Sequence, residues 1–448
     1  MTSTLFTGIT VYALCLLVIS STVQGDDPVG DPTVDTATSQ DNKKEDALAN
    51  SINDFGFNLL TKMLADNDDK NIIISPTGIA GLLSMALLGS VGKTYDELAN
   101  MLGFSQDVRI NRANHEMFGD LLKALNDNTT TSRTMFADAV FVDDDSKLRP
   151  EYRSYLERVY NGEAVQVDFT DKETVKNLIN EWVSNQTSDK ISNFLKDTLP
   201  VNTKAVLLSA LYFSGQWKHP FTPEFTMRLP FKKPKGEIMV DLMLNAGKFN
   251  TVHSAEHELR MVALPYNDST TTMYLIKPRN PEQMSLPELL NRLNYTTINK
   301  LIDNLRKNTC LIRLPKMDLQ YNANLVNPLK AMGLSSIFIP GQANFALMIE
   351  DVNLNKTDEL VTRINSEDEK NLKDIIAALP DPGVHIDEII HDVKITIDEY
   401  GTEAVAATGG FLARSADLFY ADSPFYMFIR NEKTKLVTFS AAIFDPLS

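Results

Sequence analysis

Hydrophobic residues recur at helical spacing in the first half of the chain. Ile52, Phe55, Leu59, Leu60 and Met63 lie three or four positions apart, which predicts a helix with one buried face. The run from Asn71 to Pro76 is typical of a short buried strand stopped by proline. Further helices are predicted over Ile79–Leu88, from a capping box at Thr94–Glu97 to Gly103, and through Val175, Leu178, Ile179, Trp182 and Val183.

The second half of the chain is richer in strands. β-like runs occur at Ala205–Phe213, Met261–Pro265, Met273–Lys277 and Cys310–Lys316. Near the C-terminus, Phe425–Arg430 and Leu436–Phe444 flank Asn431–Thr434, which predicts a hairpin. Helices come first and strands later, without the regular alternation of a doubly wound sheet. The pattern therefore predicts an α+β fold.

The first 25 residues resemble a signal peptide. The apolar run Val11–Ile19 is too short to span a bilayer, and the small-residue ending Val23-Gln24-Gly25 is compatible with cleavage. No Lys or Arg precedes the run, so a noncleaved anchor is the alternative. Residues 26–45 contain no aromatic residue and are rich in Asp and Thr, which predicts a disordered leader. Order is expected from Asp46.

Net charge, cysteine content and glycosylation motifs indicate which partners and which cellular compartment to expect. The net charge of −16 opposes general binding to a polyanion, so no nucleic acid partner is expected. Cys15 would leave with the signal, and Cys310 would remain alone without an internal disulfide. We expect a secreted, extracellular glycoprotein with no membrane association after signal removal. Five Asn-x-Ser/Thr sequons are candidate glycosylation sites: Asn128, Asn185, Asn267, Asn294 and Asn355.

Two short motifs have the spelling of catalytic sites without their context. His253-Ser254-Ala255-Glu256-His257 matches an inverted zinc-peptidase motif, but its flanks are typical of strand and turn rather than helix. Gly92-Lys93-Thr94 lacks the first glycine of a phosphate-binding loop. No Gly-x-Ser-x-Gly elbow occurs. We therefore expect neither an enzyme nor a bound metal or cofactor.

The segment after Gly401 has the physical properties of an insertable strand. Alternate residues from Thr402 to Leu412 are uncharged and mostly small, while the other face carries the single charge, Glu403. Such a segment could enter a sheet without burying a charge on its uncharged face. Extended, residues 401–414 would reach roughly 45 Å. A flexible linker of small residues is the alternative interpretation of these residues alone.

This segment resembles the hinge of inhibitory serpins, where Gly, Thr, Glu and a run of Ala precede the reactive site. The resemblance covers nearly all of residues 46–448. Its other motifs are Asn71–Pro76, Ala210–Trp217 with Pro220-Phe221, Ile312–Lys316, Leu329–Leu334, Pro424-Phe425 and Phe439–Pro446. Length alone predicts two or three domains, whereas the resemblance implies one.

The resemblance implies a serpin fold of about nine helices around three β-sheets, with an exposed reactive-centre loop at about 401–422. It also implies a mechanism in which a protease cleaves the loop and the hinge inserts into the large sheet. The hinge would comprise Glu399, Gly401, Thr402, Glu403, Ala404, Val405, Ala406, Ala407 and Thr408. The region where the sheet opens would include Gly78, Ser209, Trp217 and His391.

Two departures from the family pattern stand out. The Ser–Asn–His group expected beneath the sheet opening is represented here by Gly78, Ser209 and His391, so only the histidine is retained. The second departure is an acidic insertion at about 349–384, which is expected to form a solvated surface segment. We hypothesise that this insertion shields or recruits a partner; a lengthened connection is the alternative.

The reactive bond is predicted at Arg414–Ser415, because the pocket of a trypsin-like protease binds Arg through a buried Asp. Family spacing from Gly401 instead indicates Ser415–Ala416, and Phe411 or Leu412 would suit a chymotrypsin-like pocket. The expected function is extracellular inhibition of a trypsin-like serine protease by a monomer. The alternative is a non-inhibitory serpin acting as a carrier, storage protein or chaperone.

Overall fold

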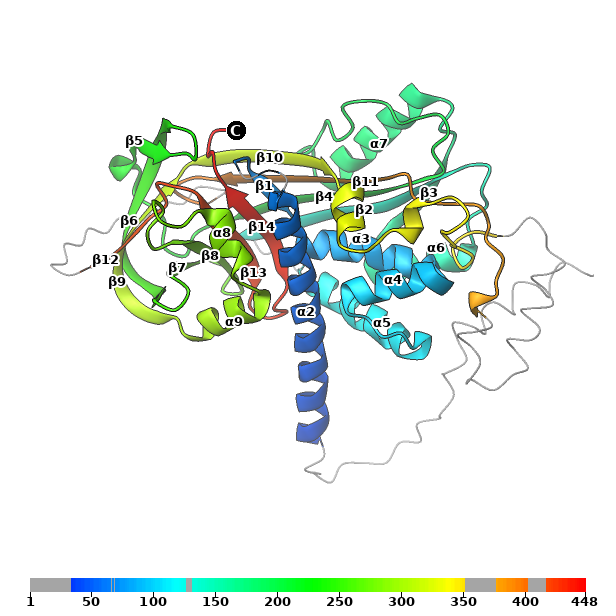
Figure 1. Cartoon of the computed structure of the whole chain (residues 1–448), viewed down its shortest axis with the longest axis horizontal. Coiled ribbons are helices and arrows are strands. Elements are labelled where there is room, and N and C mark those ends of the chain that lie inside the picture. The colour runs from blue at the N-terminus through cyan, green and yellow to red at the C-terminus, as the bar shows by residue number, and fades with distance from the viewer. Residues whose placement is uncertain (1–33, 66, 68, 126–130, 351–375, 402–415) are drawn as a thin grey trace, which may run out of the picture.

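The computed structural model describes residues 34–65, 67, 69–125, 131–350, 376–401 and 416–448. Within these residues the chain forms nine α-helices, two short 3-10 helices and fourteen strands. Figure 1 shows a broad sheet that spans the molecule, with helices on both of its faces and a second sheet at one end. The α+β class predicted from the sequence is confirmed.

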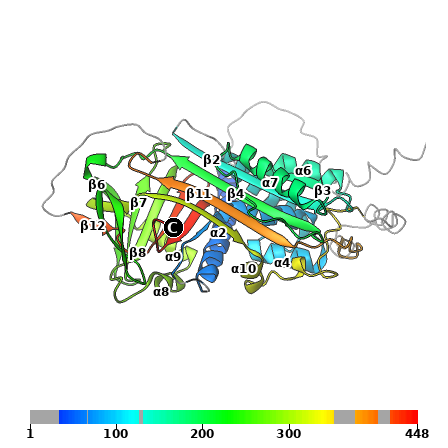
Figure 2. The same ribbon diagram turned by 90° about the horizontal axis from the view of Figure 1, so that it is seen from above.

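The broad sheet has five strands. Their order is β10 (Met317–Asn324), β11 (Glu388–Ile397), β4 (Ala205–Gly215), β2 (Ser132–Asp143) and β3 (Glu163–Val167). β11 pairs with β4 in parallel, although long stretches of chain separate them, and β2 pairs with β3 in parallel. The other two contacts are antiparallel. Figure 2 shows β4 and β11 side by side along the length of the sheet.

The central strands β4, β11 and β2 are buried on both faces for most of their length, which explains their largely apolar sequences, whereas alternate residues of the edge strand β10 are exposed. Leu207 and Val140 pack in the core that includes α3 (Pro76–Gly89). Their neighbours Leu208 and Ala139 pack instead with residues of α7 (Lys172–Gln186). Side chains alternate between faces along a strand, so every second residue of β4 and β2 lies on the α3 side.

The second sheet has nine strands. Its path runs β1 (Ile72–Ile74), β14 (Val437–Ile443), β13 (Phe425–Asn431), β8 (Thr271–Pro278), β7 (Leu259–Pro265), β6 (Glu237–Ser254), β9 (Arg306–Pro315) and β12 (Asp417–Tyr420), with β5 (Met227–Lys232) also on β6. The 18-residue β6 pairs with β5 over Glu237–Leu242, with β9 over Leu242–Thr251 and with β7 over Asn250–Ser254. Two of the three expected sheets are therefore continuous through β6.

Helix α2 (Val34–Ala65) begins twelve positions before Asp46, so residues 34–45, expected to be disordered, are helical. Leu48, Ile52 and Leu59 anchor the later turns in the core. Once a helix is nucleated by packing, each further residue is added at little free-energy cost. Figure 1 shows the early turns projecting from the body of the molecule.

Helix α4 (Gly92–Leu102) ends at Gly103 as predicted, but its predicted start is wrong. The helix begins two residues before Thr94, after Val91, which makes no side-chain cap. Thr94 Oγ1 accepts instead from the Asn344 amide, and the Glu97 carboxylate accepts from the amides of Ser335 and Ser336. Both side chains thus accept hydrogen bonds from backbone amides in loops far along the chain, and local sequence does not reveal such partners.

The remaining helices are α5 (Val108–Leu125), α6 (Pro150–Tyr160), α8 (Leu286–Asn291), α9 (Tyr295–Asp303), α10 (Val326–Ala331), and the 3-10 turns η1 (Pro223–Phe225) and η2 (Ser336–Phe338). Of these, α6 contacts β3 and α8 contacts β8, while α5, α9 and α10 pack against α2. Among the residues that the structure describes, no helix is long and apolar enough to cross a membrane.

Candidate functional site

The parallel contact between β4 and β11 is the centre of the site, and we call it the β4–β11 seam. Its register joins Glu388–Ile395 to Val206–Phe213 over eight consecutive pairs. Parallel ladders are slightly less stable per residue than antiparallel ones. Of the two contacts that β4 makes, the one with β11 is parallel and the one with β2 is antiparallel. Separating β4 from β11 therefore breaks the less stable kind of ladder.

A row of three polar side chains crosses the sheet at the middle of the seam. Asp138 of β2 is paired in register with Ser209 of β4, and Ser209 is paired with His391 of β11. Residues paired in register project to the same face, which here is the side of α3, because an added Cβ on Gly78 would approach Ser209 Oγ at 3.0 Å. Polar groups therefore lie where the rest of the α3 face is apolar.

Ser75, immediately before α3, connects this row to the helix. Its backbone N–H donates to His391 Nε2 at 2.9 Å, which places the histidine proton on Nδ1. Its Oγ accepts from the Gly78 amide at 3.0 Å and caps the helix. The structure thus brings Gly78, Ser209 and His391 together beneath the seam.

The row is incompletely hydrogen-bonded. Among the described residues, Asp138 Oδ1, Ser209 Oγ and His391 Nδ1 are buried atoms that make no hydrogen bond of normal length and angle, although Ser209 interacts weakly with both Asp138 and His391. Burial raises the pKa of Asp138 to about 7, against a smaller opposing effect of Ser209. Burial also lowers the pKa of His391 to about 3. A buried polar atom without a partner costs about 1–3 kcal/mol, so this stretch of the seam is less stable than an apolar one.

The sequence analysis did not identify Asp138 or Ser75 as residues of the site. Asp138 is a charged residue within the apolar run Met135–Val142, and that break was the available signal. Ser75 could have been found as the capping residue before Pro76, since Pro is favoured in the first turn of a helix. Neither signal indicates that the two residues meet beneath the same seam.

Gly401 turns the chain at the end of the seam. Its φ is +111°, and an added Cβ would lie 2.1 Å from the carbonyl oxygen of Gly215 at the end of β4. The residue forms isolated bridges with Gln216 and Asp398. Only glycine fits this combination of positive φ and close backbone approach. The chain therefore leaves β11 directly against the end of β4.

Trp217 holds the same end of the seam. Its indole Nε1 donates to the carbonyl of Asp398 at 3.0 Å, and its amide donates to the carbonyl of Tyr400 at 3.0 Å. The ring stacks on Tyr266 with the centroids 4.5 Å apart. These contacts fix the backbone from which the predicted hinge departs.

Glu399 also holds the backbone at the end of β11, in addition to Gly401 and Trp217. Its carboxylate accepts from Thr226 Oγ1 at 2.7 Å and pairs with Lys316 Nζ at 2.9 Å. Burial opposes ionisation, but the bond from Thr226 and the pairing with Lys316 outweigh it, so the pKa of Glu399 is lowered. The carboxylate is therefore ionised at neutral pH.

Most of the predicted hinge and the preferred reactive bond lie outside the described residues. These are Thr402, Glu403, Ala404, Val405, Ala406, Ala407 and Thr408, together with Arg414 and Ser415. Ala416 is described and directly precedes β12, whose Asp417 is paired in register with Cys310. The two described ends of the predicted loop are therefore fixed to different sheets.

The acidic insertion is described only at its ends, since residues 351–375 lie outside the described part. Glu350 pairs with Lys147 at 2.6 Å. On the other side, Ile376 and Leu379 are buried with Val91 and Ala346. Both ends of the insertion are therefore attached to the body.

Three of the five sequons are described and exposed: Asn185, Asn267 and Asn294. Asn294 also caps α9 by accepting from the Thr297 amide at 2.8 Å, which leaves its side-chain nitrogen available. Asn128 and Asn355 lie outside the described residues.

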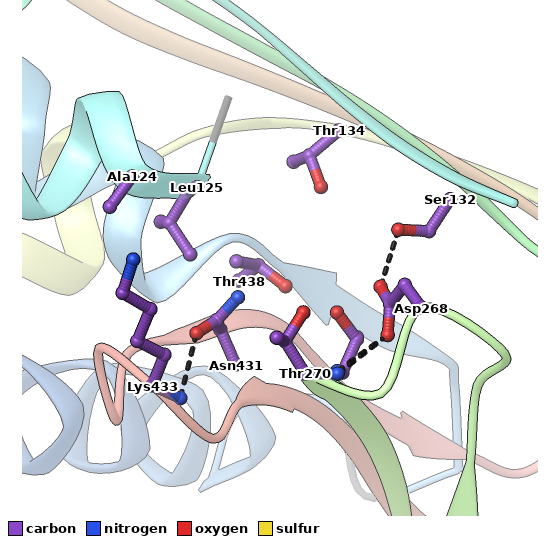
Figure 3. Close-up of a pocket in the computed structure, with 10 residues that line it drawn as sticks. Ala124, Leu125, Ser132, Thr134, Asp268, Thr270, Asn431, Lys433 and Thr438 are labelled. Atoms are coloured by element: carbon purple, nitrogen blue, oxygen red, sulfur yellow. Dashed lines mark hydrogen bonds between the residues drawn. The ribbon is translucent and has the colours of Figure 1, made fainter. Parts of the chain in front are cut away.

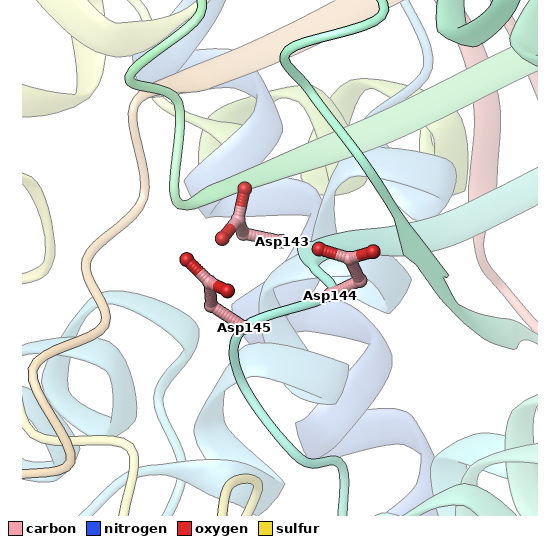
Figure 4. A group of neighbouring side chains, drawn as sticks. All are labelled: Asp143, Asp144 and Asp145. Atoms are coloured by element: carbon pink, nitrogen blue, oxygen red, sulfur yellow. The ribbon is translucent and has the colours of Figure 1, made fainter.

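The predicted zinc-like motif is not on a helix. His253 lies in β6 and pairs with Asp417 at 3.5 Å, while His257 lies in the turn that follows. Figure 4 shows a separate acidic group, Asp143, Asp144 and Asp145, with carboxylates near one another. Asp143 already pairs with Lys204 at 3.2 Å and the other two are exposed, so this group is an acidic turn.

A small pocket of 200 Å³ lies beside the first residues of β2, one strand from the Gly401 end of the seam, between the ends of α5, β2, β8 and the β13–β14 hairpin (Figure 3). Asp268 accepts there from the amides of Thr270 and Thr271, and Asn431 accepts from the amide of Lys433. These polar groups stabilise turns, so the pocket adds no chemistry to the site.

Comparison with known proteins identifies the family to which this fold and this sequence are similar. The family model described as serpin (serine protease inhibitor) matches residues 50–446. Serine protease inhibitor 28Dc of Drosophila melanogaster is 30% identical, over 92% of this chain and 81% of that protein. Plasminogen activator inhibitor 1 of Neovison vison is 28% identical, over 90% of this chain and 94% of its own length.

Solved structures show the same fold. Native protease nexin-1 with heparin superposes with a TM-score of 0.74 at 25% identity, over 89% of this chain and 99% of that one. Thyroxine-binding globulin in complex with thyroxine gives 0.76 at 21% identity, over 90% of this chain and 100% of that one. The second likeness concerns the fold alone. With the family match over nearly the whole chain, the conclusion is that this protein belongs to the serpin family.

Proposed function

We propose that the protein is an extracellular serine protease inhibitor that is cleaved by its target and inserts its hinge into the β4–β11 seam. The observation that carries this proposal is the position of Gly401. The chain leaves β11 there and lies against the end of β4, at the mouth of the parallel contact. Names of relatives such as plasminogen activator inhibitor 1 support the same class of activity.

The geometry of the seam favours insertion of a third strand. A segment that turned back at Gly401 would run antiparallel to both β4 and β11. It would replace one parallel ladder by two antiparallel ladders, which are more stable per residue. The incompletely bonded row at Asp138, Ser209 and His391 lowers the cost of separating the two strands.

The chemistry needs only the reactive bond and the protease's own serine. The serine hydroxyl attacks the carbonyl carbon of Arg414, the bond to the Ser415 nitrogen breaks, and that nitrogen leaves as a protonated amine. The protease is then held as an ester on Arg414. Water would hydrolyse this ester, and insertion competes by distorting the protease first.

A trypsin-like target is preferred because Arg414 would pair with the buried Asp of its specificity pocket. Cleavage at Ser415–Ala416 would indicate an elastase-like target. The signal-like first 25 residues and the exposed sequons Asn185, Asn267 and Asn294 support secretion as a glycoprotein, and we propose that the protein acts as a monomer.

A denaturing gel tests the proposal. The protein is mixed with trypsin, and an ester-linked complex that survives SDS is the expected result. Simple clipping without a complex would contradict inhibition and support the non-inhibitory alternative. Mass measurement of the released C-terminal peptide identifies the cleaved bond, and a peptide beginning at Ser415 is expected.

The variant Thr402→Arg tests insertion separately. An arginine at this position would have to enter the sheet, so trypsin should cleave the variant without being trapped. The control is Asn291→Arg, which adds the same charge at an exposed position in α8. Equal yields of complex from both variants would refute insertion into the seam.

A further inference from the structure

A second cavity, far larger than the pocket of Figure 3, lies beside β12 and is not explained by protease inhibition. It has a volume of 680 Å³ and lies between the end of β5, the end of β8, the segment before α8 and the chain that joins β12 to β13. We call it the β12 cleft. Ligand sites for small organic molecules typically have volumes of this size.

The lining of the β12 cleft is basic in a chain whose net charge is −16. Five lining residues are basic and two are acidic: Lys232, Lys233, Arg260, Lys277 and Arg279 against Glu282 and Asp422. The three lysines pair with Glu282, Asp445 and Asp422, so the excess of positive charge comes from Arg260 and Arg279. The exposed side chain of Arg279 has no ion-pair partner within the described part of the chain. A local excess of positive charge in a concave site attracts anions.

The cleft also contains buried polar groups. Lys277 is only 7% exposed, and its ammonium donates to Asp422 Oδ1 at 3.0 Å and to the carbonyl of Tyr420. Ser423 Oγ and Arg260 Nε are buried, and neither has a hydrogen-bond partner among the described residues, although Arg260 Nη1 donates to the carbonyl of Leu418 at 2.9 Å. Buried donors without partners are rare in native proteins, so these two indicate a missing acceptor.

Apolar side chains provide the rest of the lining. Met284, Leu286 and Phe444 are buried beneath the cleft, while Leu418 of β12 is 44% exposed at its edge. A ligand with an apolar body would cover Leu418 and gain from the removal of this surface from water.

We propose that the β12 cleft binds a small organic anion, a carboxylate, sulfate or phosphate ester with an apolar body. The anionic group would accept from Arg260, Arg279 and Ser423, and the apolar body would lie over Met284 and Leu418. The occupant would connect β12 and the segment after it to β7 and β8. Binding requires no cleavage of the reactive loop, so it is independent of the proposed inhibition.

The test uses the full-length native protein and the fluorescent aromatic sulfonate 8-anilinonaphthalene-1-sulfonate. We expect saturable binding of one probe per chain by calorimetry, and displacement of the probe by octyl sulfate. Inorganic sulfate and octanol supply the anionic group and the apolar body separately, and each alone should compete at least tenfold more weakly. Lack of saturable binding, or equal competition by octanol, would overturn the proposal.

Two charge-reversal variants locate the site. Arg279→Glu, at an exposed and unpaired position, should weaken probe binding about tenfold or more. Lys172→Glu makes the same change of charge at an exposed position on α7 and should leave the affinity unchanged. Equal affinities in the two variants would place the probe elsewhere and refute the assignment. In the native protein, octyl sulfate should also slow amide hydrogen exchange in Leu418–Tyr420.

Discussion

The β4–β11 seam and the β13–β14 hairpin differ in strand direction, in chain connection and in hydrogen bonding. All seven residues of β13 and all seven of β14 are buried, and their pairing is antiparallel across a tight turn. An aromatic contact also joins the hairpin to β8, since Phe428 stacks on Tyr274 with the ring centroids 4.9 Å apart. The seam pairs distant segments in parallel and contains buried polar atoms without partners.

This difference separates the part of the molecule that must stay closed from the part that is proposed to open. The hairpin gains from local connection and dense apolar packing. The seam lacks the local connection, and polar atoms without partners interrupt its apolar packing. Its end is held by Gly401, Trp217 and Glu399. Stability should therefore be lost most when the hairpin is changed, and inhibition should be altered most when the seam is changed.

Phe428→Ala should have the largest effect on stability. Removing a fully buried ring from the hairpin leaves a cavity and should reduce the free energy of unfolding by about 3–5 kcal/mol. Urea denaturation followed by circular dichroism measures this loss. Phe225→Ala, at a half-exposed ring, is the control and should change stability little. Per folded molecule, the yield of complex with trypsin should be unaffected by either change.

Gly401→Ala should combine a moderate loss of stability with a change in inhibition. The new Cβ would clash with the Gly215 carbonyl and force the chain off the end of β4. We expect a loss of about 2–3 kcal/mol and a higher number of inhibitor molecules cleaved per trypsin trapped. Gly236→Ala is the matched control, because its φ is +93° but nothing lies within 4 Å of the added Cβ. Indistinguishable behaviour of the two variants would contradict the role of the contact.

Asp138→Asn should stabilise the protein in a pH-dependent way. Because the folded pKa of Asp138 is raised to about 7, its contribution to stability is present below pH 4 and is lost as the pH rises through 7. The amide cannot ionise, so the variant should gain roughly 1–3 kcal/mol at pH 8 and nothing near pH 4. Denaturation at several pH values measures the difference. His391 contributes equally to both proteins, and exposed Asp145→Asn should show no such trend.

Glu399→Gln should have the smallest effect. Its folded pKa is lowered, so its contribution is present above pH 4.5 and is lost as the pH falls through the folded value. Since Lys316 is partly exposed, we expect a loss of about 0.5–1 kcal/mol at neutral pH. Thermal unfolding at pH 7 and pH 3 measures it, with Glu288→Gln as the surface control. A larger loss at pH 3 than at pH 7 would contradict this account.

The predicted elements were right where burial is continuous over a local segment. The strands around Ala205–Phe213 and Phe425–Arg430 and the helix over Ile79–Leu88 were all predicted within a few residues. The start of α4 was not, because Thr94 and Glu97 bond to residues far along the chain. Local spacing contains no information on such partners.

The site could be predicted in part, because some of its residues are polar residues or glycines next to apolar strand segments. Gly401 and His391 were identified through the family resemblance, and the structure explains Gly401 by its positive φ. Asp138 was missed because its significance depends on strand register, which pairs it with Ser209. The spacing of residue types along the sequence could not predict the β12 cleft or its buried donors without partners, because four separate segments of the chain meet there.

Cys310 makes the attachment of β12 directly observable. The thiol is 1% exposed, and burial, with a smaller contribution from the Asp417 carboxylate, raises its pKa to about 12. Its neighbour in register is Asp417, the first residue of β12. While β12 remains paired with β9, a thiol reagent should therefore react slowly; departure of that strand would uncover the sulfur. After removal of residues 1–25 it would be the sole thiol of the chain, so its alkylation rate would report the integrity of this edge without any engineered label.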